Sequence, residues 1–213
     1  MTKIRRRRFN EWTSTGKSWP LTASLMAIIV SLSFLFWKGY KIEWLYALVG
    51  LPLLCFAMTG IIYKFLFPAF KRNVITNILV HMIWTSAVAV ATSFIATKEL
   101  HWDVLLAIVP VTLIAAGITH GKNRLSAYAY AVKVFISYLY VVVFSFLGYF
   151  PMTTIIIFLT VAIAFGCSKT MINSIEGGAH LTKDMGARTA NLLHLFSILL
   201  AIAFVVGKLL LQK

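Results

Sequence analysis

Seven apolar stretches alternate with short charged segments along this chain of 213 residues. A helix that crosses the hydrocarbon of a bilayer needs roughly 17 to 25 mostly apolar residues. Backbone that faces lipid must also be helical, because no water is present to satisfy its polar groups. The pattern therefore predicts an all-α, polytopic membrane helix bundle with about seven transmembrane helices. We place them near residues 20–37, 44–67, 74–97, 102–118, 125–150, 152–172 and 190–210. The fourth is short and contains Pro110, so we expect it to kink or to lie buried among its neighbours.

Basic residues gather on alternate segments between these stretches. One side carries Lys3, Arg5, Arg6, Arg7, Arg8, Lys17, Lys64, Lys71, Arg72, Lys122, Arg124, Lys169, Lys183 and Arg188. The other side carries only Lys38, Lys41, Lys98, Lys208 and Lys213. Segments rich in Lys and Arg remain on the cytoplasmic side of a membrane. We therefore expect a cytoplasmic N-terminus and a C-terminus outside, in a bacterial-type inner membrane.

Composition agrees with this class. Hydrophobic residues make up 60% of the chain and charged residues 12%, and the mean hydropathy is +0.87. We expect a basic cytoplasmic N-terminal segment at 1–19, with no cleaved signal peptide, and a single transmembrane domain at 20–213. The net charge of +14 is better matched to anionic lipid headgroups than to nucleic acid, since no soluble module could present a groove. The run Arg5 to Arg8 is either an anchor for acidic lipids or a topology signal.

Ionisable groups are scarce inside the predicted spans. The six acids, Glu11, Glu43, Glu99, Asp103, Glu176 and Asp184, all fall outside the spans or at the very end of one. Because proton-coupled transporters usually keep a carboxylate at depth, a small-solute transporter is the weaker interpretation. Lys133 lies near the end of its span and can snorkel, as a structural residue. His81 and His194 either form interhelical hydrogen bonds or bind a haem as paired axial ligands. Cys55 and Cys167 are expected to be apolar fillers.

Chemistry is concentrated in two predicted cytoplasmic segments. The first follows the second span and contains Lys64, Lys71 and Arg72 without an acid. The second runs from Asn173 to Thr189 and combines acids, bases, His180 and the Gly177-Gly178 pair. Cationic side chains at such a turn can bind a phosphate or diphosphate, and Thr182 or Thr189 could cap the adjoining helix. The alternative interpretation is a hydrophilic connector whose cations only fix the topology.

The second segment resembles the UbiA-type prenyltransferase superfamily of intramembrane enzymes. The resemblance rests on Asn173-Ser174-Ile175-Glu176 followed by Gly186-Ala187-Arg188-Thr189, and upstream on residues 117–124 and Gly148-Tyr149-Phe150. It implies a bundle whose cytoplasmic face binds an isoprenoid diphosphate and transfers the prenyl group to an acceptor. In that family, aspartates of both segments hold magnesium, which neutralises the leaving diphosphate.

The chain departs from the family at these acids and is shortened to seven helices. Only Glu176 and Asp184 remain as metal ligands, so a magnesium cofactor has little support. The resemblance therefore implies a degenerate relative that binds an isoprenoid or lipid phosphate, with altered or lost prenyltransferase activity. The side chains expected to hold the phosphate are Lys64, Lys71, Arg72, Arg124, Asn173, Lys183 and Arg188. Aromatic residues Trp84, Tyr128, Tyr138 and Phe165 could line a channel for the apolar tail, although core packing is their simpler use.

A second function remains open. The chain could be a non-catalytic scaffold or accessory subunit of a membrane complex, with protein partners packed against its aromatic-rich helices. Small residues of the third and fourth spans, such as Ala89, Ala91, Ala115 and Ala116, allow close helix contact. They suit either function.

Overall fold

A computed structural model describes residues 19–61, 74–117, 124–177 and 185–211. Every regular element in these ranges is helical. The elements are α2 (Trp19–Lys38), α3 (Trp44–Ile61), α4 (Val74–Thr97), α5 (Val104–Ala115), α6 (Arg124–Phe146), the 3-10 helix η3 (Met152–Thr160), α7 (Val161–Gly177) and α8 (Met185–Leu211). The predicted basic N-terminal segment lies almost entirely outside the described residues, and so do the turns at 62–73, 118–123 and 178–184.

Within the described residues, five helices are long and apolar enough to cross a membrane. They are Leu21–Lys38, Leu79–Thr97, Ala127–Phe146, Met152–Asn173 and Met185–Leu211. Two shorter apolar helices, Trp44–Met58 and Val104–Ala115, accompany them. This set of helices is that of an integral membrane protein. Each predicted span overlaps a described helix, and the span at 152–172 is divided between η3 and α7.

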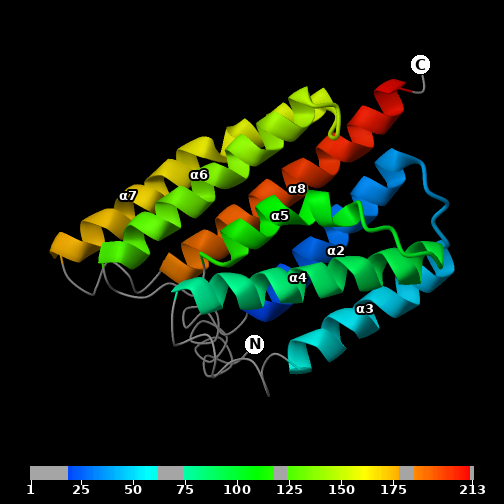
Figure 1. Cartoon of the computed structure of the whole chain (residues 1–213), viewed down its shortest axis with the longest axis horizontal. Helices are drawn as coiled ribbons and strands as arrows, with labels where there is room; N and C mark the ends of the chain where they lie inside the picture. Colours follow the sequence, from blue (N-terminus) through cyan, green and yellow to red (C-terminus); the bar gives the residue numbers. More distant parts are fainter. Residues whose placement is uncertain (1–18, 62–73, 118–123, 178–184, 212–213) are drawn as a thin grey trace, which may run out of the picture.

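The helices run back and forth along one direction, and α2 lies between several of the others (Figure 1). α2 packs against α8, α4, α5 and α3, while α6 packs against α5, α7 and η3. We call the end where α2 and α8 begin the inner end, and the end where they finish the outer end. From Arg188 to Lys208, α8 rises about 30 Å, which equals the hydrocarbon thickness of a typical bilayer. α8 thus carries a basic residue near each membrane surface.

Two helices end at a glycine with a left-handed backbone. Gly39 follows α2 with φ +85°, and Gly148 follows α6 with φ +79°. At the first, the Gly39 amide donates to the Phe36 carbonyl and the Tyr40 amide to the Leu35 carbonyl, both at 3.1 Å. This pairing satisfies carbonyls that the end of a helix would leave open, and glycine adopts its conformation without a steric penalty. Gly148 therefore ends α6 at Phe146, four residues before the predicted limit of that span.

The sixth predicted span is a composite. Its first nine residues form η3, and α7 continues from Val161. η3 lies against α8, where a Cβ on Gly207 would stand only 2.6 Å from the Pro151 Cβ. Thr153 also donates its hydroxyl to the Ala203 carbonyl at 2.6 Å. Glycine at 207 thus allows the start of η3 to approach the α8 backbone closely.

Buried side chains fill the space between the helices. Three phenylalanine rings from different parts of the chain are fully or almost fully buried: Phe34 of α2, Phe204 of α8, and Phe150 of the turn before η3. Their ring centroids are 5.4 to 6.2 Å apart with near-perpendicular planes, a favourable edge-to-face geometry. Polar pairs also join helices: Trp84 Nε1 donates to Ser24 Oγ at 3.0 Å. Such contacts hold helices together in lipid, where apolar burial alone gives little driving force.

α5 is the most enclosed of the helices. Eight of its twelve residues are buried, including Pro110, Val111 and Ile114. A helix of this length extends about 18 Å, less than the roughly 30 Å of hydrocarbon. The expectation that the fourth span lies buried among its neighbours is therefore confirmed.

Candidate functional site

The sequence-predicted phosphate-binding residues fall into three groups in the structure. Lys64, Lys71, Arg72, Lys183 and Asp184 lie outside the described residues. Arg124 opens α6 and Glu176 belongs to the last turn of α7, but their side chains are not among those described. Asn173 and Arg188 are described, and both are exposed.

Asn173 and Arg188 belong to neighbouring helices at the inner end. Asn173 lies one turn before the end of α7, and Arg188 is in the first turn of α8. α7 and α8 pack against each other. Lys169, one helical turn before Asn173, is also exposed. A cation in the first turn of α8 adds to the positive end of the helix dipole, so this end of α8 favours an anion.

The helix ends that border the basic turns are at the same end of the molecule. α3 and α7 finish, and α4 and α8 begin, at the inner end, at the left and bottom of Figure 1. The alternation of helix directions produces this arrangement. The helix ends that flank the two predicted phosphate-binding segments therefore lie at one end of the bundle, whereas the segments themselves are outside the described residues.

A buried polar cluster lies behind this face. Tyr130 of α6 is fully buried, and its hydroxyl is 3.1 Å from the Thr189 hydroxyl of α8. Tyr130 also hydrogen-bonds Cys167 of α7. Thr189 donates to the Met185 carbonyl at 2.8 Å. Of the two residues predicted as possible caps, Thr189 does not cap α8, because α8 begins at Met185 and Thr189 lies one turn inside it. The other, Thr182, lies outside the described residues.

Lys133 stabilises the buried end of α5. Its side chain is only 5% exposed, and Nζ donates to the Ala116 carbonyl at 3.1 Å. Ala116 is the C-cap of α5, where the carbonyls and the helix dipole present partial negative charge. The structural role predicted for Lys133 agrees with this contact, but the side chain does not snorkel to the surface. It reaches a backbone carbonyl instead.

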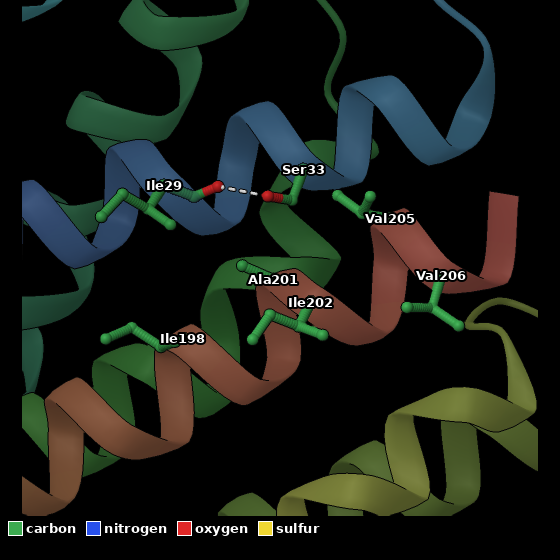
Figure 2. Close-up of a pocket in the computed structure, with 7 residues that line it drawn as sticks. All are labelled: Ile29, Ser33, Ile198, Ala201, Ile202, Val205 and Val206. Atoms are coloured by element: carbon green, nitrogen blue, oxygen red, sulfur yellow. Dashed lines mark hydrogen bonds between the residues drawn. The ribbon is translucent and has the colours of Figure 1, made fainter. Parts of the chain in front are cut away.

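The aromatic residues proposed for a tail channel do not gather around one cavity. Trp84 and Tyr138 are buried, and each is hydrogen-bonded to a neighbouring helix, Tyr138 to Thr160 at 2.6 Å. Tyr128 and Phe165 are more than half exposed. A cavity described by the structure lies elsewhere, between α2 and α8, and none of these residues lines it (Figure 2).

His81 and His194 are separated by other helices. His81 is fully buried in α4, and His194 of α8 is half-buried. α2 and α5 each pack against both α4 and α8. Paired axial ligation of a haem requires two imidazoles that face one another across the cofactor. The packing of the helices therefore gives no support to haem ligation by His81 and His194. In the described part of the chain, no three His, Cys, Asp or Glu side chains come together to hold a metal ion.

Sequence reasoning missed a polar cluster at the outer end. The Tyr40 hydroxyl donates to Asp103 Oδ2 at 3.0 Å. The Tyr40 and His101 rings stack with centroids 3.7 Å apart, and His101 Nε2 is 3.8 Å from Glu99 Oε2. These contacts join the turn after α2 to the turn before α5. The sequence shows His101 and Asp103 close together, but only the fold brings Tyr40, more than sixty residues away, to them.

The variant Tyr40→Phe should loosen this outer connection. The phenol pKa is raised above its usual value by burial first, then by the hydrogen bond and charge of Asp103. A raised pKa means that this contribution to stability is complete below pH 10 and is lost at higher pH. We expect Tyr40→Phe to lower the free energy of unfolding by about 1 kcal/mol at pH 7. Above pH 10, the variant should lose less stability with rising pH than the parent protein does. Thermal unfolding from pH 7 to 11 tests this; identical pH profiles for both proteins would contradict it.

No family model, curated protein or solved structure matches this chain. The structure itself defines the class, an integral membrane protein built as an all-helical bundle. Its inner end carries exposed cationic and amide side chains, and its interior is held by interhelical hydrogen bonds.

Proposed function

We propose that this chain is a membrane protein of UbiA-like architecture that binds an isoprenoid or lipid phosphate at its inner end. The observation that carries the proposal is the position of Arg188. It is exposed in the first turn of α8, and α8 packs against α7, whose exposed Asn173 lies near the same end of the bundle. A guanidinium and the backbone amides of a first helical turn are groups that bind phosphate oxygens at helix N-termini.

The basic segments predicted to complete the site attach to the same face. Lys183 lies in the segment between α7 and α8, and Lys64, Lys71 and Arg72 in the segment between α3 and α4. In the proposed topology all seven apolar helices take part, and the inner end faces the cytoplasm. The positive-inside bias supports that orientation.

Catalysis is a separate question from binding. Lys and Arg can hold a diphosphate without a metal, yet turnover requires stabilisation of its departure. Glu176 and Asp184 are too few carboxylates for the metal cluster that such a reaction uses in the family. We therefore propose a phosphate-binding protein whose prenyltransferase activity is altered or lost.

The test is direct binding of farnesyl diphosphate to the full chain in phosphatidylcholine nanodiscs. We expect Arg188→Ala and Lys183→Ala each to weaken binding about 10- to 150-fold, the effect of losing one hydrogen bond to a charged group. The control is Lys41→Ala, at the outer end, whose side chain is 90% exposed and ion-paired with Glu43. It should bind like the parent protein.

Two results would refute the binding proposal: no saturable binding by the parent protein, or equal affinity in all three variants. A parallel assay with radiolabelled farnesyl diphosphate, magnesium and a set of aromatic and lipid acceptors distinguishes an enzyme from a binding protein. If the parent neither binds nor reacts but is purified with a protein subunit, the scaffold function takes precedence.

A further inference from the structure

A groove runs along the surface between α2 and α8, far from the proposed phosphate site. Its volume is 280 Å³. Figure 2 shows Ile29 and Ser33 of α2 facing a row of α8 side chains across it. The α8 side of the groove consists of Ile198, Ala201, Ile202, Val205 and Val206. Its lining contains one polar side chain, and the Ser33 hydroxyl is turned away to the Ile29 carbonyl at 2.9 Å. The groove is thus suited to a hydrocarbon chain.

The depth of the groove matches one leaflet of a bilayer. Ile198 is ten residues before Lys208 on α8, a distance of about 15 Å along the helix axis. Half of the hydrocarbon core is also about 15 Å thick. A chain that enters at the level of Lys208 therefore reaches the end of the groove near the middle of the membrane.

The two helices that border the groove each carry a lysine in the last turn at the outer end, Lys38 on α2 and Lys208 on α8. Lys208 follows Ala201 and Val205 on one face of α8, since these positions are separated by one and two helical turns. Its ammonium is so close to the end of α2 that a Cβ on Gly39 would be 2.9 Å from Nζ. The neighbouring Lys38 is exposed, and its Nζ is 4.7 Å from the Trp37 ring centroid. Neither lysine is ion-paired with a carboxylate of the described chain, so both can contact an added anion.

We propose that this groove binds an anionic phospholipid of the leaflet at the outer end. The lipid phosphate lies between Lys208 and Lys38, and one acyl chain occupies the groove between α2 and α8. The distribution of charge favours a lipid over a transmembrane helix of another chain. A helix would place apolar side chains along the full height of the seam, whereas here the apolar slot is one leaflet deep and both helices that border it carry a lysine in their last turn.

The site is independent of the proposed function. Arg188 and Lys208 are separated by twenty residues of α8, or about 30 Å. Loss of one site therefore leaves the other unchanged. Farnesyl diphosphate binding can serve as a control for the integrity of variants at the outer end if the parent protein binds it, and unfolding temperature in neutral lipid serves in either case.

The experiment measures how tightly phosphatidylglycerol binds to the purified full chain relative to phosphatidylcholine, by native mass spectrometry of lipid titrations. Each lysine near an anionic lipid contributes roughly a fivefold change in affinity. We expect the parent to prefer phosphatidylglycerol, and the double variant Lys38→Gln/Lys208→Gln to lose about 30-fold in its affinity. The charge-matched double variant Lys41→Gln/Lys98→Gln, at the same end, should retain the preference.

A second pair of variants tests the acyl chain. Ile202→Trp fills the groove, whereas Ile163→Trp adds the same ring to an exposed position of α7 outside it. Ile202→Trp should reduce binding of both lipids, and Ile163→Trp should not. The proposal is overturned if the parent shows no preference between the lipids, if both lysine pairs have the same effect, or if Ile202→Trp binds like Ile163→Trp. A dimer that is lost in Ile202→Trp alone would assign the groove to a second copy and also overturn it.

Discussion

Replacing Lys133 with glutamate is expected to destabilise the bundle by about 3–5 kcal/mol. The ammonium of Lys133 donates to the Ala116 carbonyl at the buried C-terminal end of α5. A carboxylate there would face the negative end of the helix dipole without a donor, so it would have to stay buried as a charge or take up a proton. Mixed-micelle unfolding followed by tryptophan fluorescence measures the change.

Two further variants separate charge from shape at this position. Lys133→Met keeps the length of the side chain but leaves the Ala116 carbonyl without its cation, so it should cost about 1–3 kcal/mol. Lys169→Glu makes the same charge change at an exposed position of α7 and should change stability by less than about 0.5 kcal/mol. Equal effects of Lys133→Glu and Lys169→Glu would show that the contact with α5 has no structural importance.

The second large effect is expected for Phe204→Ala. Phe204 of α8 is fully buried, and its ring centroid is 5.4 Å from those of Phe34 and Phe150. In a water-soluble core this truncation costs about 3–5 kcal/mol. Part of that cost is transfer from water, which is absent when the unfolded helices also remain in lipid. We therefore expect about 2–3 kcal/mol, from lost packing.

The matched control is Leu209→Ala on the same helix. Leu209 is 53% exposed. Its side chain contacts lipid, and after truncation lipid fills the space that the side chain leaves, so few protein contacts are lost. We expect a change below about 0.5 kcal/mol in the same unfolding assay. A loss for Leu209→Ala as large as that for Phe204→Ala would mean that apolar area, rather than helix packing, determines the stability of this bundle.

The positions of the helices were predictable because their cause is local. Each apolar run must be helical in lipid, and the runs are separated by charged or glycine-containing turns. The observed helices α2 and α4 fall within one residue of the predicted spans at both ends. The ends that differ depend on finer chemistry: Gly148 ends α6 early, and α8 starts at Met185, five residues before the predicted span.

The candidate site was predictable only as a set of residue types. The sequence places cations on alternate segments, and alternation of helix direction puts the described helix ends that flank those segments at one end of the bundle. It does not show that Tyr130, Cys167 and Thr189 meet behind that face, because they come from three different helices. The contact of Lys133 with Ala116 has the same origin. Both depend on which helix faces pack together, and one-dimensional periodicity leaves that open in a chain that is apolar on every side.

The sequence alone thus determined that the chain crosses a membrane, where its helices lie and how its charge is distributed, because lipid imposes those features on each segment separately. The tertiary structure decided which polar groups meet. It placed Tyr40 on His101 and Asp103 at the outer end, and it set Lys208 beside Gly39 above an apolar groove. These contacts join residues far apart in the chain, so they arise from helix packing and cannot be read from any single stretch.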